Sequence, residues 1–168
     1  MSDDELRPQK RGRKIAMTTE ERDAFLTEER TCRVATMGTT GPHATPLWYA
    51  WLDGALWLTS LSRSQRWADL QKDPRIAVVV DAGTRYGELR GVEVTGRAEV
   101  VGDVPRGGEP HPELTAVEQL FAGKYYDGPF VTDGRHAWLR IRPEKLTSWD
   151  FRKNPALGGS APPGTPTA

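Results

Sequence analysis

The sequence contains a single cysteine, Cys32, among its 168 residues. One cysteine excludes an intramolecular disulfide, and this suits a reducing compartment, so we expect a cytoplasmic protein. Cys32 lies at the expected start of a strand. We interpret it as a small buried residue, because a catalytic thiol needs a basic partner and only the neighbouring Arg33 offers one.

Membrane and nucleic-acid signatures are also missing. No apolar run approaches the length of a membrane span, and the charged amino terminus lacks the apolar core of a signal peptide. The 23 basic residues balance the 23 acidic residues, so neither nucleic acid nor a membrane surface is an expected partner. The three histidines (His43, His111 and His136) are scattered without metal-ligand spacing, so no metal site is expected.

Catalytic signatures are scarce. No glycine-rich dinucleotide fingerprint follows a strand, and no nucleophile-elbow pattern is present. No side chain stands out as a proton donor, and Tyr49 and Tyr86 are the weak candidates. Such scarcity is typical of a protein whose cofactor carries the reaction while the polypeptide binds and orients it.

What is present is an unusual stretch at residues 56–75, LWLTSLSRSQRWADLQKDPR. An apolar strand leads into hydroxyls and arginines, and a short amphipathic helix follows that Asp73-Pro74 ends. Free backbone N–H groups, the helix dipole and arginine together favour an anion, so we predict a phosphate-bearing ligand at residues 59–66. The alternative is that Ser64 is only a helix cap and that Arg63 and Arg66 are solvated.

The rest of the chain alternates between strand and helix signals. Asp53-Gly54 is a hairpin turn, and Gly91 and Gly96 indicate bends in a long strand. We expect helices at 18–29, through Trp67 and Leu70, and at 112–126, and strands at 33–37, 43–52, 55–60, 75–82, 89–102 and 136–149, the last interrupted at Pro143. This order predicts a mainly β fold with flanking helices (α+β), built as a six-stranded antiparallel split β-barrel.

Three regions follow from composition. Residues 1–16 carry acids and then a basic cluster at Lys10, Arg11, Arg13 and Lys14, and we expect a disordered basic arm. A second interpretation is that this arm folds over an anionic ligand. Residues 17–153 form the cofactor-binding domain, and residues 154–168, rich in Pro, Gly, Ala, Ser and Thr, are expected to be a disordered tail.

Several runs resemble one family. TSLSRSQRWADLQKDPRIAVVVD resembles the phosphate-binding segment of the pyridoxamine 5′-phosphate oxidase-like split β-barrel superfamily, which binds flavins and deazaflavins. RVATMGTTGPHATPLWYAWLDGALWLTS is similar to its paired first strands, and GVEVTGRAEVV to its long fifth strand. The resemblance covers residues 31–150. It implies a homodimer with a flavin-type cofactor in each of two grooves between the subunits.

The resemblance also implies site residues. Four match the cofactor-phosphate positions: Thr59, Ser60, Ser64 and Arg66. Four match the strand that edges the isoalloxazine ring: Thr45, Pro46, Leu47 and Trp48. Residues 86–90 and 149–153 are expected to complete the groove from the partner subunit. For Trp51 we favour core packing over a place in the wall of the groove.

The carboxyl-terminal sequence departs from that of the family, and this departure limits the reactions that we expect. The carboxyl-terminal run SWDFRKN lacks the arginine-bearing motif with which pyridoxamine phosphate oxidases grip their substrate, so vitamin B6 oxidation is not expected. The spacing from Thr59 to Arg66 resembles that of the deazaflavin-dependent branch, whose coenzyme F420 carries a polyglutamate tail that the basic arm would suit.

We therefore expect an oxidoreductase that transfers hydride between F420 or FMN and a small organic substrate. Two alternatives stay open. One is a non-catalytic flavin-binding carrier or sensor. The other is a haem-binding or haem-degrading member of the same fold, with His136 or His43 as the axial ligand.

Overall fold

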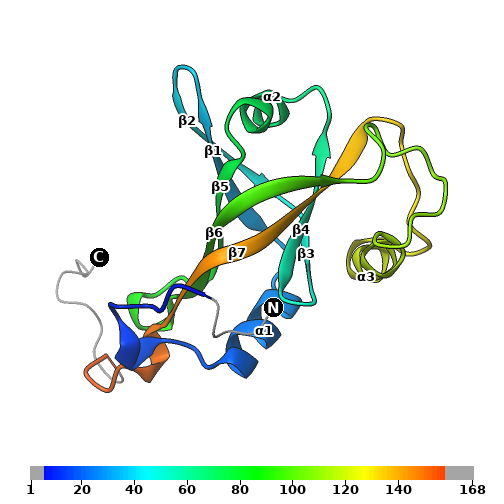
Figure 1. The fold of residues 1–168 in the computed structure, drawn as a ribbon. Helices are drawn as coiled ribbons and strands as arrows, with labels where there is room; N and C mark the ends of the chain where they lie inside the picture. The colour runs from blue at the N-terminus through cyan, green and yellow to red at the C-terminus, as the bar shows by residue number, and fades with distance from the viewer. Residues whose placement is uncertain (1–5, 158–168) are drawn as a thin grey trace, which may run out of the picture.

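A computed structural model describes residues 6–157 of the chain (Figure 1). Its strands are β1 (Cys32–Gly38), β2 (Gly41–Leu47), β3 (Tyr49–Leu52), β4 (Ala55–Leu61), β5 (Arg75–Ala82), β6 (Arg90–Val101) and β7 (His136–Asp150). The α-helices are α1 (Thr19–Glu28), α2 (Gln65–Lys72) and α3 (Thr115–Tyr125). Short 3₁₀ turns are η2 (Arg13–Ile15), η3 (Tyr86–Glu88) and η4 (Phe151–Lys153). Within residues 6–157, no helix is long and apolar enough to cross a membrane.

The strands form one antiparallel sheet in the order β2-β1-β5-β6-β7-β4-β3. Its two outermost strands, β2 and β3, are consecutive in the chain and are separated only by Trp48. The sheet therefore curls until its two edges meet at this residue, which is the closure expected of a split barrel. The predicted fold class is confirmed, but the count of six strands is wrong. The predicted strand 43–52 breaks at Trp48, because β2 pairs with β1 whereas β3 pairs with β4.

The long strand β6 pairs with β7 along its whole length, and the two strands carry the curvature. Their register shifts between Thr95 and Gly96, since Thr95 faces Lys145 whereas Gly96 faces Pro143, which leaves Glu144 as the extra residue. A Cβ at Gly96 would lie 2.6 Å from the carbonyl oxygen of Arg142, so only glycine fits. Pro143 lies at this bulge and does not interrupt β7.

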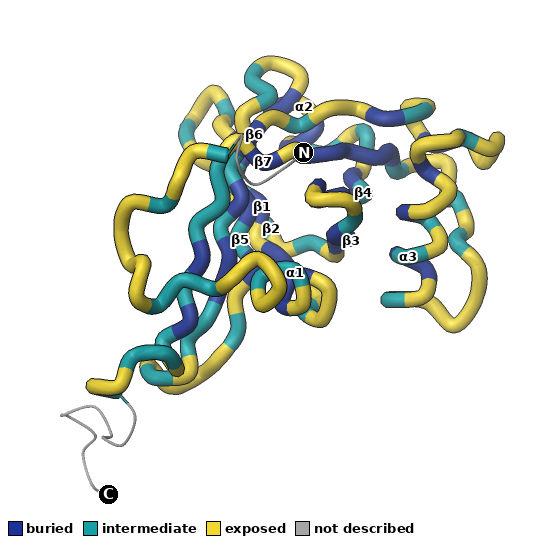
Figure 2. The backbone as a smooth tube through the Cα atoms, turned by 60° about the horizontal axis from the view of Figure 1, so that its bottom comes forward, coloured by how far each residue is buried: buried dark blue, intermediate teal, exposed yellow. Residues whose placement is uncertain are grey.

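The main core fills the inside of the barrel. It contains alternate residues of β5 and β6, namely Ile76, Val78, Val80, Val92 and Val94. The intervening residues of β5 are half-buried or exposed (Figure 2), so our expectation that this strand is buried on both faces is wrong. A second, smaller core lies where α3 packs on the outer face of the sheet, and it contains Trp57, Val117, Phe121 and Trp138.

Two helices cover opposite ends of the barrel (Figure 1). The predicted capping box of α1 is confirmed, because Thr18 and Glu21 each accept a hydrogen bond from the other's backbone N–H, at 3.2 and 2.8 Å. Helix α1 buries Phe25 and Leu26, and α2 buries Trp67 and Leu70, all in the barrel core. The third predicted helix begins at Thr115 rather than near residue 112.

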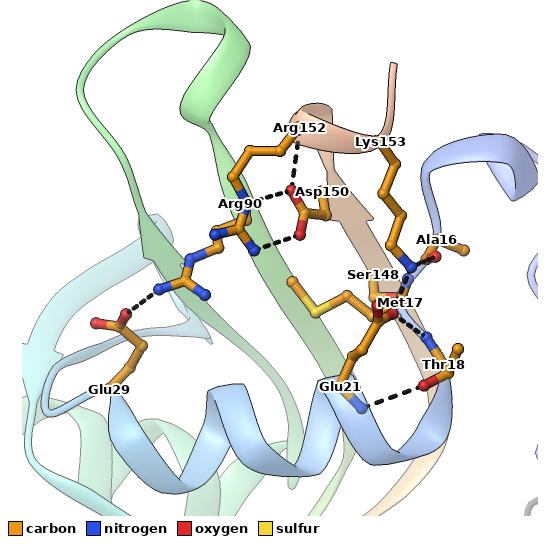
Figure 3. A network of polar contacts seen from close by, with 10 residues as sticks. All are labelled: Ala16, Met17, Thr18, Glu21, Glu29, Arg90, Ser148, Asp150, Arg152 and Lys153. Carbon is orange, nitrogen blue, oxygen red and sulfur yellow. Dashed lines mark hydrogen bonds and ion pairs between the residues drawn. The ribbon is translucent and has the colours of Figure 1, made fainter. Parts of the chain in front are cut away.

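The described part of the expected disordered arm, residues 6–16, makes defined contacts with β7. The side-chain amide of Gln9 accepts from the Ser148 N–H and donates to the Ser148 carbonyl, both at 3.0 Å, as a neighbouring strand would. Figure 3 shows Met17 donating to the Ser148 hydroxyl and Lys153 bonded to Ala16 and Glu21. The arm thus differs from expectation over these residues. Residues 1–5 and 158–168 lie outside the described residues.

Candidate functional site

The site begins where β4 ends and α2 starts. Ser64 is the N-cap of α2, and its hydroxyl accepts from the Trp67 N–H at 3.2 Å. In the first turn of α2, Arg66 turns inward rather than outward, so that it is only 6% exposed. Its Nε donates to the hydroxyl of Ser60 at 3.3 Å, and its Nη1 donates to the hydroxyl of Thr45. Two strands and a helix therefore converge on one guanidinium group.

Arg66 is a buried cation, and within residues 6–157 no carboxylate forms an ion pair with it. Burial lowers the pKa of its guanidinium because the charged form loses hydration. A buried charge without a counter-charge is unfavourable, and an anion bound beside it would restore the balance. The structure bears on the alternative interpretation of this stretch, whereas the phosphate ligand stays a prediction. Ser64 is a cap and Arg63 is exposed, but Arg66 is not solvated.

A groove lies on the outer side of the same strands. It consists of a pocket of about 230 Å³ and an adjoining hollow of about 390 Å³, which share Trp48, Thr59 and His136. The hollow is completed by Thr31, Pro46 and Leu47. The pocket is completed by Arg106, Phe121, Tyr126, Phe130, Val131, Thr132, Asp133, Ala137 and Trp138.

Aromatic rings form the wall of the groove. Trp48 stacks on Tyr125 with 4.6 Å between ring centroids and 9° between planes, yet it stays 47% exposed. The hydroxyl of Tyr125 donates to the Tyr49 carbonyl at 2.8 Å, which ties α3 to the start of β3. Trp48 is thus held flat at the point where the barrel edges meet. A flat, half-exposed aromatic surface suits a planar ligand.

The predicted site residues fall into two adjacent groups. Thr45, Ser60 and Arg66 lie together on the inner side of the strands, while Pro46, Trp48 and Thr59 face the groove on the outer side. Leu47 reaches both, because it lines the groove and also packs against the barrel core. The division follows from the alternation of side chains along β2 and β4. Ser64 contributes through the helix cap.

Several groove residues were not identified from the sequence. They come from α3, from the irregular segments on either side of it and from β7, and include Arg106, Phe121, Tyr126, Phe130, Asp133 and Trp138. The helical spacing of Phe121 and Tyr125 was visible but indicates core packing equally well. Trp51 is buried in the core, as we favoured. Tyr86 contacts Phe151 at 5.0 Å between ring centroids, at the far end of β6 and β7, so a role for these segments in a partner's groove stays a prediction.

The curled sheet defines a split-barrel protein, and it carries a buried arginine at a strand-to-helix junction. The family model for pyridoxamine 5′-phosphate oxidase matches residues 18–150, and the chain belongs to this family. A search of curated proteins finds no match.

Solved structures support the same assignment. The conserved hypothetical protein Rv2991 from Mycobacterium tuberculosis is 32% identical, with 88% of this chain and 92% of that chain covered and a TM-score of 0.71. An F420 reductase is 21% identical, with 77% and 98% covered and a TM-score of 0.58. The haem storage protein HutZ from Vibrio cholerae is 13% identical, with 78% and 94% covered and a TM-score of 0.63. The last two likenesses show the fold alone.

Proposed function

We propose that this protein is an oxidoreductase that transfers hydride between a flavin-type cofactor, F420 or FMN, and a small organic substrate. The observation that carries the proposal is the buried guanidinium of Arg66, which has two hydroxyl partners and no carboxylate among the described residues. The likeness in fold to an F420 reductase supports this cofactor class. When bound, such a cofactor supplies or accepts the hydride.

The phosphate of the cofactor would bind at the junction of β4 and α2. Arg66 offers charge and a planar set of donors, Ser60 and Thr45 offer hydroxyls beside it, and Thr59 and Ser64 flank the junction. An anion there would also lie at the N-terminal end of α2, where the helix dipole favours negative charge. The buried arginine and its hydroxyl partners therefore fit a phosphate group.

The ring of the cofactor would lie in the groove against the bend between β2 and β3. Pro46, Leu47 and Trp48 line this bend, and Trp48 presents a flat half-exposed face. The pocket beyond Thr59 leaves room for a small substrate, because it is bounded by Phe121 and Trp138 rather than filled. The protein would contribute binding, orientation and exclusion of water, and the cofactor would contribute the redox chemistry.

The proposal includes a homodimer. Three groove residues are large, apolar and exposed: Trp48 at 47%, Tyr126 at 41% and Val131 at 71%. A second subunit covering these side chains would close the groove, as the family resemblance implies. The arm runs beside β7, where Arg7 pairs with Lys145, and α2 lies at the opposite end of the barrel from α1 (Figure 1), so a contact between the arm and the cofactor stays a separate hypothesis.

Cofactor titration tests the proposal. Purified apoprotein is titrated with FMN and with F420 while tryptophan fluorescence is followed, since Trp48 lies in the groove. We expect Arg66→Ala to weaken binding at least about 30-fold, because a hydrogen bond to a charged group contributes about 2 kcal/mol or more. Arg63→Ala is the matched control, since Arg63 carries the same charge three residues earlier but is exposed. Its affinity is expected to stay within about twofold of wild type.

The outcomes separate the alternatives. Equal losses in both variants would indicate a general charge effect and contradict a dedicated phosphate site. Tight binding without turnover of any acceptor would indicate a flavin carrier or sensor. A Soret band on reconstitution with haem, together with no flavin binding, would replace the proposal with the haem-binding alternative.

A further inference from the structure

The groove contains an ionisable pair to which the proposed cofactor site assigns no role. The Nδ1 atom of His136 lies 2.6 Å from Oδ2 of Asp133, and both residues line the pocket that also contains Thr59 and Trp48. The two side chains are 38% and 37% exposed, so they remain accessible from the groove.

The carboxylate of Asp133 is held in place by its own turn. Its Oδ1 accepts the backbone N–H groups of Arg135 at 2.9 Å and His136 at 3.0 Å, which leaves Oδ2 for the imidazole. Partial burial opposes ionisation, but these hydrogen bonds outweigh it and hold the pKa of Asp133 well below its usual range. An ionised carboxylate accepts the Nδ1–H of the ring and so leaves Nε2 as the nitrogen available to a ligand.

The position of His136 is fixed by the sheet. It is the first residue of β7, opposite Leu61 at the end of β4, and its carbonyl accepts the Arg106 N–H at 2.7 Å. Three charged groups surround the Asp133–His136 pair. Arg135 lies 3.6 Å from Asp133, and Arg106 pairs with Glu118 at 2.8 Å. The charge of Arg106 is thus already compensated, and Asp133 is the dominant partner of the imidazole.

The tyrosines named from the sequence as proton donors are placed elsewhere. Tyr49 is fully buried, its hydroxyl donates to the Leu26 carbonyl at 2.7 Å, and burial raises its pKa far above the ordinary value. Tyr86 lies beside Phe151, away from the residues that line the groove. Tyr49 is therefore wrong as a candidate proton donor. His136, which the sequence did not indicate as a proton donor, lines the groove.

We propose that His136 is the catalytic acid for substrates bound in the groove and that Asp133 is its positioning residue; this rests on the proposed function. The acceptor that we assign to these groups is an alkene conjugated to a carbonyl group, because its apolar carbons suit the pocket lined by Phe121, Phe130 and Trp138 and its reduction consumes one hydride and one proton. The β-carbon forms a new C–H bond with the hydride from the reduced cofactor, the C=C π bond breaks, and the α-carbon takes the proton from Nε2. The alkene is reduced by two electrons, the cofactor is oxidised by two, and the imidazole regains a proton from water.

The experiment uses the full-length protein loaded with reduced F420 or FMN, under anaerobic conditions, and 2-cyclohexen-1-one as the acceptor. We expect His136→Gln to lower kcat about 100-fold, with KM and the cofactor Kd within about twofold. Asp133→Asn is expected to lower kcat with KM and the cofactor Kd within about twofold, because the amide no longer holds the Nδ1–H as the carboxylate does and so no longer orients Nε2 toward the substrate. His111→Gln is the matched control, since His111 does not line the groove.

A second measurement does not depend on turnover. Carbethoxylation by diethyl pyrocarbonate, followed by mass spectrometry, reports access to each histidine. We expect bound cofactor with 4-nitrophenol, a phenol that mimics the substrate enolate, to slow modification of His136 at least about fivefold and to leave His111 unchanged. Equal modification of His136 with and without ligands overturns the proposal.

The kinetic outcomes are also decisive. Failure of the wild type to bind either cofactor removes the proposed function and this inference together. Tight cofactor binding with unchanged kcat in His136→Gln overturns the inference alone. Cofactor binding without reduction of cyclohexenone likewise overturns the assigned substrate class and the acid role, while leaving the cofactor site intact.

Discussion

The buried charge of Arg66 is unfavourable for the stability of the free protein but would favour the binding of an anionic ligand. Its guanidinium is almost completely buried, and the lowered pKa reports the loss of hydration. The hydroxyls of Ser60 and Thr45 compensate only in part, because neutral partners do not cancel a charge. A bound phosphate would supply the missing charge, so ligand binding and stability are expected to be linked at this residue.

Gly91 is a second residue whose identity is imposed by its neighbours. A Cβ there would lie 2.4 Å from the Trp149 ring and 2.8 Å from the Val80 carbonyl oxygen. We expect Gly91→Ala to destabilise the protein by ~2 kcal/mol, because a buried strand and an indole ring must both move. Gly123→Ala is the control: its Cβ meets nothing within 4 Å on α3, and we expect a gain of up to ~1 kcal/mol. Urea unfolding of both variants checks that the change in unfolding free energy is a loss for Gly91→Ala and a gain for Gly123→Ala.

At the scale of elements, Lys124 joins three parts of the fold. It comes from α3, its ammonium lies 4.2 Å from the centre of the Tyr49 ring at the start of β3, and it approaches the Leu26 carbonyl of α1 at 3.5 Å. Burial, with a smaller contribution from nearby Arg30, lowers the pKa of Lys124 to about 8. The contact therefore holds α3 against the barrel at the expense of a partly dehydrated charge.

This lowered pKa predicts a pH dependence. Between pH 8 and the ordinary lysine value of 10.5, the unfolded chain binds more protons at this position than the folded chain, so stability should rise with pH. The buried Cys32 thiol, whose pKa is raised to about 12, acts in the opposite direction above pH 9. Comparing the stability of wild type with that of Lys124→Met at each pH isolates the contribution of the lysine. We expect the stability difference between wild type and variant to change by ~1 kcal/mol from pH 7 to pH 9 in favour of wild type. If chemical denaturation gave the same difference in unfolding free energy at pH 7 and pH 9, the prediction would be contradicted.

At the scale of the molecule, the barrel closes at Trp48 but leaves the groove uncovered. The stacked pair of Trp48 and Tyr125 lies at the junction, with Tyr126 and Val131 exposed beside it. An exposed apolar rim around a groove is typical of a surface that another chain covers. The proposed homodimer would therefore complete the cofactor site as well as bury this rim.

Oligomeric state tests this arrangement. We expect light scattering to give twice the chain mass of 18.7 kDa. Val131→Asp, which places a charge on the most exposed residue of the rim, should shift the protein toward monomer and weaken cofactor binding at least about tenfold. Val131→Ala removes bulk without adding charge, so it should stay dimeric and keep the cofactor affinity of wild type. A dimer that persists in Val131→Asp with unchanged cofactor affinity would exclude this rim from the interface.

The sequence by itself determined the local features of this protein. Asp53 and Gly54 have φ values of 51° and 70°, as the predicted hairpin turn requires, and the α1 capping box forms as predicted. The junction of strand, hydroxyls and helix at residues 56–75 is also present where expected. These features depend on neighbours in the chain, so backbone preferences and short-range hydrogen bonds are enough to specify them.

Only the tertiary structure decided how these pieces meet. The inward turn of Arg66 depends on hydroxyls from two strands, one of them 21 residues away. The break at Trp48 exists because the two halves of one strand pair with opposite edges of the sheet. The pairing of Asp133 with His136 is local, but its place beside Thr59 depends on β7 lying against β4. These are long-range contacts fixed by closure of the barrel, and no local pattern in the sequence encodes which strands will close it.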